Sequence, residues 1–453
     1  MELYQIENFE QLSSAIEAKE YKRIRTFFDD TNIVDAATIV DPLQTDQLLH
    51  LFKVLRKEIG AELLTYLDPE TVERLTNHLQ PETLHKLLEE LYSDDLNEIL
   101  SELPDELVLR ILNAASPELR KDINSFLSYE ENSCGSIMSN EFITLRANST
   151  VEQAMRSIQR QGKVAETISW CYITDDSRRL VGMVELKEIL FAQDLIKIEE
   201  LMEIDVHSVF TSDDQEAAAK LISKYDITAI PVVDSTGVIL GIITVDDILD
   251  VFEEEATEDF HKMGAMNPLS DSYLKTATLE IVRSRLPWLL ILMLSATFTG
   301  HIISNNQELL VLLPTLTIFI PMLMDTSGNA GSQASSMVIR GIIIDDMGLK
   351  DAFNIVKKEF SVSMLIGFIL FIINTLRIGL FMPDVGWPVA ILVSITVILV
   401  VLIANLVGGI LPLVAVWLKM DPASMAGPLI TTLVDALSLM TYFKMATYFM
   451  RVF

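Results

Sequence analysis

A dense run of carboxylates lies between residues 246 and 259 of the 453-residue chain. Several of these acids are three or four residues apart, and like charges at that spacing destabilise a helix unless another charge neutralises them. Hard oxygen ligands at this density suit Mg²⁺ or Ca²⁺. The run therefore predicts a divalent-cation site, with a solvated acidic surface as the alternative. Its members are Asp246, Asp247, Asp250, Glu254, Glu255, Glu258 and Asp259.

A second candidate is a single carboxylate inside an apolar segment. Asp435 lies about the middle of the apolar run 423–450, where an unpaired charge costs at least ~3 kcal/mol in a bilayer. Helical spacing would give it small or polar neighbours, namely Gly427, Pro428, Thr431 and Ser438. These surroundings favour a cation site over simple helix packing.

Polar residues also mark two further apolar segments. One stripe at helical spacing consists of Asp325, Asn329, Ser332, Gln333 and Ser336. In the apolar segment 389–418, Asn405 is followed by Gly408, Gly409 and Pro412, and we expect these residues to interrupt the helix. Packing between membrane helices through small and amide side chains is the alternative for Asn405 and the serines.

Five apolar runs follow residue 285, and they cover residues 286–303, 309–324, 360–381, 389–418 and 423–450. A spanning helix needs about 20 residues. The second run is too short alone, so it can span only if residues 325–340 continue it at membrane depth. The lysines and arginines next to these runs place the N-terminus inside and the C-terminus outside. We therefore expect five spans.

The composition divides the chain into two unlike parts. Residues 1–270 carry 53 acidic and 23 basic side chains, whereas residues 271–453 carry 11 of each. This division excludes a single-domain soluble enzyme, a basic nucleic-acid-binding protein and a disordered acidic chain. The two cysteines, Cys134 and Cys171, favour a reducing compartment. Because the first residues lack the features of a signal peptide, we expect the acidic part in the cytoplasm.

Helix-start signals recur through residues 1–130. Successive signals at Pro69, Pro81, Ser93, Pro104 and Pro117 are 12, 12, 11 and 13 residues apart. Proline suits the first helical turn, and the acids beside it favour the positive end of the helix dipole. The pattern predicts an array of short helices that stack their leucine faces.

Residues 137–250 contain an internal repeat, in which VGMVELKEIL at 181–190 matches LGIITVDDIL at 240–249. Each copy predicts a strand, a helix, two strands and another helix. The pair resembles tandem CBS domains, regulatory modules that commonly bind adenine nucleotides. The resemblance implies that Thr244 and Asp247 would contact the ribose and phosphate of a nucleotide such as ATP. The first copy has Glu185 and Glu188 instead, which would repel phosphate, so nucleotide binding is left open.

The order of these parts resembles the MgtE family of magnesium channels. The resemblance is carried by EATEDFHKMGA (255–265), PMLMDTSGNAGSQASSMVIR (321–340), ANLVGGILP (404–412) and DPASMAGPLITTLVDALSLMTYF (421–443). It implies a homodimer in the plasma (inner) membrane, with cytoplasmic N-terminal domains and a pore at the two-fold axis. The implied parts are a helical-array domain (1–130), tandem CBS domains (131–253), a connecting plug helix (254–284) and a five-helix transmembrane domain (285–453).

The resemblance also assigns residues to the ion path and to ion sensing. It places Asp435 in the pore, and with it we expect Gly427, Pro428, Thr431, Asn329 and Asn405 along the path. The implied Mg²⁺-sensing acids are Glu216, Asp226, Asp247, Asp250, Glu255, Glu258, Asp259 and Asp421. A segment similar to the DDLxD motif of the family adds Asp94 and Glu98.

These observations favour passive Mg²⁺ conduction that is gated by Mg²⁺ binding to the cytosolic acids. Without Mg²⁺ the carboxylates repel one another, and bound Mg²⁺ would remove that repulsion and close the pore. One alternative is a transporter of another divalent cation such as Co²⁺ or Mn²⁺; the absence of His and Cys from the polar stripes disfavours soft metals. Another is a CBS-gated membrane sensor that moves no ion. The sequence shows no arrangement of a nucleophile and a base that would indicate an enzyme.

Overall fold

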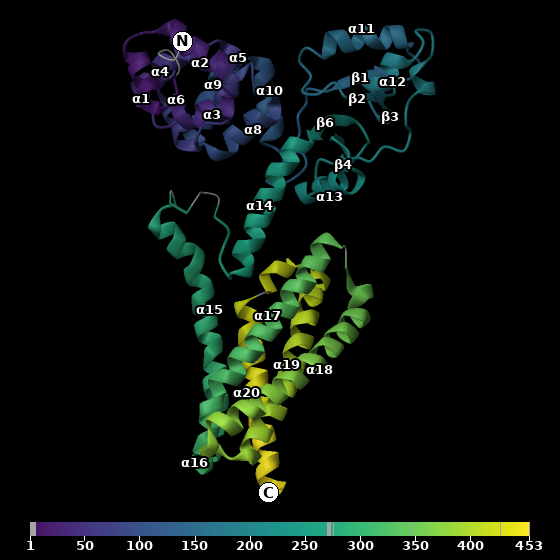
Figure 1. The fold of residues 1–453 in the computed structure, drawn as a ribbon. Coiled ribbons are helices and arrows are strands. Elements are labelled where there is room, and N and C mark those ends of the chain that lie inside the picture. The colour runs from purple at the N-terminus through teal and green to yellow at the C-terminus, as the bar shows by residue number, and fades with distance from the viewer. Residues whose placement is uncertain (1–5, 270–272, 275, 346, 426, 453) are drawn as a thin grey trace. The chain divides into compact units, whose positions relative to one another are not determined.

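The computed structural model describes residues 6–269, 273–274, 276–345, 347–425 and 427–452. Its contacts divide the chain into two compact units, Met1–Phe252 and Glu253–Phe453, and each is described by itself. The chain passes from the first unit to the second inside helix α14, Val245–Met263 (Figure 1).

An array of short helices forms the first part of the N-terminal unit, and buried leucines of successive helices share one core. Its helices are α1 (Phe9–Glu17), α2 (Tyr21–Asp30), α3 (Ile33–Val40), α4 (Thr45–Val54), α5 (Lys57–Thr65), α6 (Pro69–His78), α7 (Pro81–Leu88), α8 (Ser93–Glu102), α9 (Asp105–Ala114) and α10 (Pro117–Phe126). Pro69, Pro81 and Pro117 are the first residues of their helices, as proline's missing N–H allows. The predicted array is confirmed.

Two similar sheets follow in the same unit. The first copy comprises β1 (Ile143–Arg146), α11 (Val151–Gln161), β2 (Trp170–Thr174), β3 (Leu180–Glu185) and α12 (Leu186–Phe191). The second comprises β4 (Val209–Phe210), α13 (Gln215–Tyr225), β5 (Ala229–Val233), β6 (Ile239–Thr244) and the start of α14. In each sheet the first two strands are parallel and the last two antiparallel. This order of elements confirms the predicted internal repeat.

The two copies share one irregularity and differ in one loop. The strand register shifts after Ile173 in the first copy and after Val232 in the second. In the turns that follow, Asp175 and Asp234 each accept backbone N–H groups two and four residues later, at 2.8 and 2.9 Å in both copies. Helices α11 and α13 begin 64 residues apart, whereas strands β2 and β5 begin 59 apart. The first copy therefore has five more residues between its helix and its strand, in the loop 162–169.

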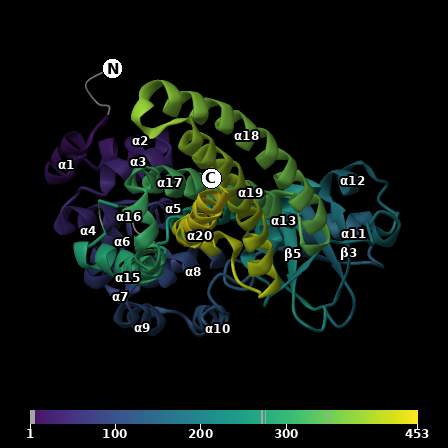
Figure 2. The ribbon, with the colours of Figure 1, turned by 90° about the horizontal axis from the view of Figure 1, so that it is seen from below.

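Long helices make up the C-terminal unit. They are α15 (Thr278–Asn305), α17 (Ile320–Ile344), α18 (Ala352–Phe381), α19 (Trp387–Trp417) and α20 (Pro428–Val452), with the short α16 (Gln307–Leu312) after α15. Among the residues described, four segments are long and apolar enough to cross a membrane, and they contain α15, α18, α19 and α20. The more polar α17 has 25 residues. Helix α19 packs against α17, α18 and α20, and α15 packs against α20 (Figure 2).

The predicted second span has the wrong bounds. Residues 309–324 are divided among α16, a 3₁₀ helix at Pro314–Phe319 and the start of α17. Pro321 lies in the first turn of α17, where a proline needs no amide hydrogen bond. The Gly- and Ser-rich residues 325–340 therefore form the body of the helix.

The expected connecting helix over 254–284 is also wrong as a continuous element. Helix α14 ends at Met263, and α15 begins at Thr278. Ala265 adopts a left-handed conformation with φ of 53°, and Pro268 cannot donate a backbone hydrogen bond. These two residues end the helical path after α14.

Helix α19 continues unbroken through Asn405, Gly408 and Pro412, so the predicted interruption is wrong. The glycine instead permits close packing. A Cβ atom at Gly408 would lie 2.2 Å from the carbonyl oxygen of Gly331 in α17. Small residues commonly allow membrane helices to approach in this way.

We expect Gly408→Ala to lower the free energy of unfolding by about 1–3 kcal/mol, because the added methyl group must push α17 away from α19. Thermal unfolding of the purified chain in detergent would measure the change. Gly300→Ala in α15 is the matched control, because a Cβ atom there meets nothing within 4 Å. Equal stability of the two variants would contradict the close contact.

Candidate metal centres

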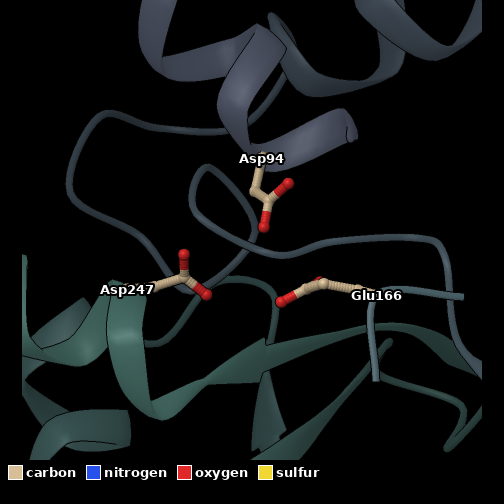
Figure 3. A group of neighbouring side chains, drawn as sticks. All are labelled: Asp94, Glu166 and Asp247. Atoms are coloured by element: carbon tan, nitrogen blue, oxygen red, sulfur yellow. The ribbon is translucent and has the colours of Figure 1, made fainter. Parts of the chain in front are cut away.

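Three carboxylates from distant parts of the sequence meet in the N-terminal unit (Figure 3). Asp94 lies in the first turn of α8, and Asp247 lies in the first turn of α14. Glu166 belongs to the loop 162–169 of the first copy. Each residue offers one oxygen, and these oxygens lie within 4.8 Å of one another. We call this group the acid triad.

Burial and mutual repulsion disfavour the charged forms of the acid triad. Burial, with the nearby charges of Glu166 and Asp247, raises the pKa of Asp94 well above its usual 3.8. Burial likewise raises the pKa of Glu166 and brings that of Asp247 to about 6. Among the described residues, no lysine or arginine forms an ion pair with any of the three. A cation bound between them would supply the missing positive charge.

The surrounding polar groups position the triad without satisfying it. The backbone N–H and the hydroxyl of Thr244 donate to Asp247 Oδ2 at 3.0 and 2.8 Å. Glu166 Oε2 is buried and accepts no hydrogen bond from the part of the chain that the structure describes, which is uncommon for a buried polar atom. Mg²⁺ takes oxygen ligands at about 2.0–2.1 Å in an octahedron. Ligand oxygens of such an ion lie about 3–4 Å apart, so small side-chain movements would fit the triad to it.

The raised pKa values predict a pH effect. Burial raises the pKa of both Asp247 and Asp95 to about 6. Such a carboxyl group stabilises the folded state below its ordinary pKa of about 4, and this contribution is lost as the pH rises through about 6. We therefore expect the Mg²⁺-free protein to lose about 1–3 kcal/mol of unfolding free energy between pH 5 and pH 7.

Unfolding temperatures of the full chain in detergent, measured across this pH range, would test the effect. Millimolar Mg²⁺ should reduce the loss, because a bound cation replaces the protons of the carboxyl groups. A stability that is the same at pH 5 and pH 7 without Mg²⁺ would contradict the raised pKa values.

The other acids of the N-terminal unit that were expected to sense Mg²⁺ lie outside the triad. Glu98 is exposed on α8, and Glu216 forms an ion pair with Lys220 at 2.9 Å. Asp226 ends α13 in a left-handed conformation, and Asp250 is exposed on α14. The structure thus brings together Asp94 and Asp247 of the expected acids, and it adds Glu166, which the sequence reasoning missed.

The expected acids of the C-terminal unit lie at the end of α14 and before α20. Glu258 and Asp421 both form ion pairs with Lys262. Glu255 and Asp259 are half-buried on α14. These residues were predicted as metal ligands, and a lysine occupies the space between two of them.

The residues expected to contact a nucleotide lie within the acidic surroundings of the triad. The Thr244 hydroxyl lies within hydrogen-bond distance of one carboxylate oxygen each of Asp246 and Asp247, and it can donate its single proton to one of them at a time. Asp247 in turn faces Asp94 and Glu166, so a phosphate group there would meet negative charge. Thr244 and Asp247 therefore do not fit a nucleotide phosphate.

Asp435 lies nearer the start of its helix than the sequence indicated, because α20 begins only at Pro428. The Ser327 hydroxyl of α17 lies 3.4 Å from Asp435 Oδ1 and 2.9 Å from the carbonyl oxygen of Met324, so these two acceptors share its one proton. Thr431, one turn earlier on α20, lies against Gly328 of α17. Asp435 thus lies at the contact of α17 with α20.

Gly427 does not share the helical face of Asp435, because it precedes α20 and has φ of 52°. This left-handed conformation favours glycine. Asn405 is buried within α19, and its side-chain oxygen accepts no hydrogen bond from the described residues.

Helix α17 exposes the polar stripe that the sequence predicted. Its buried face includes Leu323, Ser327 and Gly331. The exposed positions are Asp325, Asn329, Gln333 and Ser336, whereas Ser332 is half-buried. A carboxylate and two amides are costly against lipid. This face therefore requires water or further protein beside it.

Three kinds of family model match the chain in order. They are the MgtE intracellular N domain over residues 31–132, the CBS domain over 134–194 and 198–254, and MgtE, described as a divalent cation transporter, over 320–445. Among solved structures, the soluble part of a magnesium transporter covers 55% of this chain at 30% identity, with a TM-score of 0.52; 98% of that structure is covered. The cytosolic domain of the Mg²⁺ channel MgtE in complex with ATP covers 53% of this chain and 98% of its own, at 32% identity and a TM-score of 0.50.

Full-length relatives extend the similarity to the membrane helices. The magnesium transporter MgtE of Thermus thermophilus is 34% identical over 439 residues, which cover 96% of this chain and 97% of the relative. The magnesium transporter MgtE of Enterococcus faecalis is 33% identical over 334 residues, 73% of this chain and 72% of the relative. With this identity over nearly its whole length, the chain belongs to the MgtE family.

Proposed function

We propose that this chain conducts Mg²⁺ across a membrane, down the electrochemical gradient, and that its acidic cytosolic part regulates conduction by sensing Mg²⁺. The observation that carries the proposal is Asp435 at the contact of α20 with α17, the helix whose exposed face bears the polar stripe. The carboxylate contacts Ser327 of α17, and the same helix exposes Asp325, Asn329 and Gln333. Together these residues provide oxygen groups along a path through otherwise apolar helices.

The exposed stripe supports a homodimer as the conducting form. A second copy related by a two-fold axis would present the same polar face. Two Asp435 side chains could then share one hydrated ion, since Mg²⁺ usually keeps several waters and binds one or two carboxylates. The names of the relatives support Mg²⁺ as the substrate, because those of Thermus thermophilus and Enterococcus faecalis are called magnesium transporters.

The acid triad supports the regulatory half of the proposal. Its carboxylates belong to the helical array, the first CBS copy and the second CBS copy. Ionised and without a cation, they repel one another and favour separation of these parts. A cation that binds only the compact form shifts the population toward it, to the extent of its differential affinity.

Two alternatives give different experimental results. Another divalent cation such as Co²⁺ or Mn²⁺ would pass the same oxygen-lined path, and a sensor without transport would pass none.

ATP as a ligand of the CBS pair has support from a relative that was solved with ATP. Thr244 and Asp247 themselves fit a phosphate group poorly, because they lie among carboxylates.

Ion flux into liposomes that contain the purified full-length chain would test the proposal, with Mg²⁺, Ca²⁺ and Co²⁺ compared. We expect Mg²⁺ uptake that stops when Mg²⁺ on the cytosolic side reaches millimolar concentration. Equal uptake of Co²⁺ would show that the chain transports divalent cations without selecting Mg²⁺. Absence of flux for every ion, from protein that is folded and inserted, would favour the sensor.

A further inference from the structure

Lys262 lies between two carboxylates in the C-terminal unit. Its Nζ is 2.6 Å from Asp421 Oδ2, and it forms a second ion pair with Glu258. The three side chains are only 26–33% exposed, so water screens these pairs less than it screens pairs on an open surface. Glu258 precedes Lys262 by one helical turn, which is the favourable order for such a pair on a helix.

Both oxygens of the Asp421 carboxylate are occupied. Oδ1 accepts the backbone N–H of Ala423 at 2.8 Å, and Oδ2 accepts from Lys262. A metal ion at this carboxylate would have to displace the ammonium group or bind beside it. A second cation beside a lysine ammonium is repelled, so the pair does not fit Mg²⁺ while Lys262 is in place.

A backbone contact lies next to this ion pair. A Cβ atom at Gly427 would be 2.5 Å from the carbonyl oxygen of Met263, the residue after Lys262. The last turn of α14 therefore lies directly against Asp421 and Gly427. Pro428 begins α20, and Asp435 follows seven residues later, about 10 Å along the helix. The contact thus bears on the helix that carries Asp435.

We infer that Lys262 is the resident cation of the Glu258–Asp421 pair and that it holds the end of α14 against Asp421 and Gly427 without a metal ion. Burial alone would lower the pKa of Lys262, but its hydrogen bonds with Asp421 and Glu258 raise that pKa above its usual 10.5. The lysine therefore stays charged near neutral pH.

This inference deepens the proposed function and depends on it only for its consequence in gating. If the chain is a Mg²⁺-regulated channel, this contact between α14 and the start of α20 persists when Mg²⁺ is removed. The Mg²⁺ dependence of closure then comes from other carboxylates, the acid triad among them. Lys262 is a positioning residue, which acts on the start of α20 through its ion pair with Asp421.

Hydrogen–deuterium exchange of the full chain in detergent, with EDTA present, would test the inference. In Lys262→Gln we expect the amides of residues 258–265 and 421–425 to exchange roughly three- to tenfold faster than in the parent, as befits loss of a charge-assisted pair. Lys262→Arg should stay close to the parent because it keeps the charge. Lys419→Gln is the matched control, because Lys419 is exposed two residues before Asp421.

Mg²⁺ distinguishes a resident cation from a simple structural contact. Removal of the ammonium leaves two unpaired carboxylates, so Lys262→Gln should regain protection with Mg²⁺ and bind one more Mg²⁺ per chain by equilibrium dialysis. Asp421→Asn should lose the same protection in EDTA and regain little. This second variant keeps the test valid if Lys262→Gln folds poorly.

Parent-like exchange of Lys262→Gln in EDTA, or an unchanged number of bound Mg²⁺ ions, would overturn the inference. Neither measurement requires transport. Failure of Mg²⁺ flux in liposomes would therefore remove the proposed function and leave the exchange result intact.

Discussion

Replacing Asp435 with asparagine is expected to lower Mg²⁺ flux into liposomes by about 10- to 100-fold while the chain remains folded. Asparagine keeps the size of the side chain and an oxygen that can accept from Ser327, whose hydroxyl lies 3.4 Å from Asp435 Oδ1. It removes the charge that attracts the ion. Polar contacts with a charged group are worth about 1.5–3 kcal/mol, and each 1.4 kcal/mol in a barrier changes a rate about tenfold.

A neutralised acid away from the path provides the control for this measurement. Asp384 is exposed in the connection between α18 and α19, and Asp384→Asn should conduct like the parent. Asp435→Glu, which keeps the charge but lengthens the side chain, should retain more flux than Asp435→Asn. Parent-like flux in Asp435→Asn would remove this residue from the ion path.

Neutralising the acid triad should abolish most of the response of the cytosolic part to Mg²⁺. Fully ionised carboxylate oxygens within 4.8 Å repel by roughly 3 kcal/mol per pair at an effective dielectric constant of about 20. The variant with Asp94→Asn, Glu166→Gln and Asp247→Asn lacks both this repulsion and the ligands. We expect millimolar Mg²⁺ to stabilise the parent by about 1–3 kcal/mol and the variant by less than about 0.5 kcal/mol.

Thermal unfolding with and without Mg²⁺ would measure this response, and flux assays would show whether the variant conducts at Mg²⁺ levels that silence the parent. A charge-matched control replaces the exposed acids Glu152, Asp176 and Asp205 of the same unit with their amides. The control should respond to Mg²⁺ like the parent. A full Mg²⁺ response in the triad variant would show that the triad is an ordinary acidic surface and does not sense Mg²⁺.

Local chemistry explains which elements could be predicted from the sequence. Helices α6, α7 and α10 begin at the predicted prolines because the preference for the first turn depends on a few adjacent residues. The beginning of α17 was placed wrongly because hydropathy does not distinguish the 3₁₀ segment Pro314–Phe319 from the α-helix that follows it. The unbroken course of α19 could not be predicted either, since Gly408 is accommodated by its packing against Gly331.

The candidate sites depend more on tertiary contacts. Asp94 and Asp247 were expected as metal ligands through the resemblance to the family, whereas no motif near Glu166 in the sequence indicated a metal ligand. The available signal was the unequal spacing of the two copies, which shows that the first has a longer loop between α11 and β2. For Lys262, the spacing of four residues from Glu258 was visible in the sequence, but its pairing with Asp421 joins segments about 160 residues apart.

The paired register shifts after Ile173 and Val232, with the matching turns at Asp175 and Asp234, bear on the history of this chain. A bulge and a side-chain-closed turn at the same place in both halves are inherited most simply from one ancestral unit that underwent gene duplication. The extra length of the loop that carries Glu166 distinguishes the two descendants.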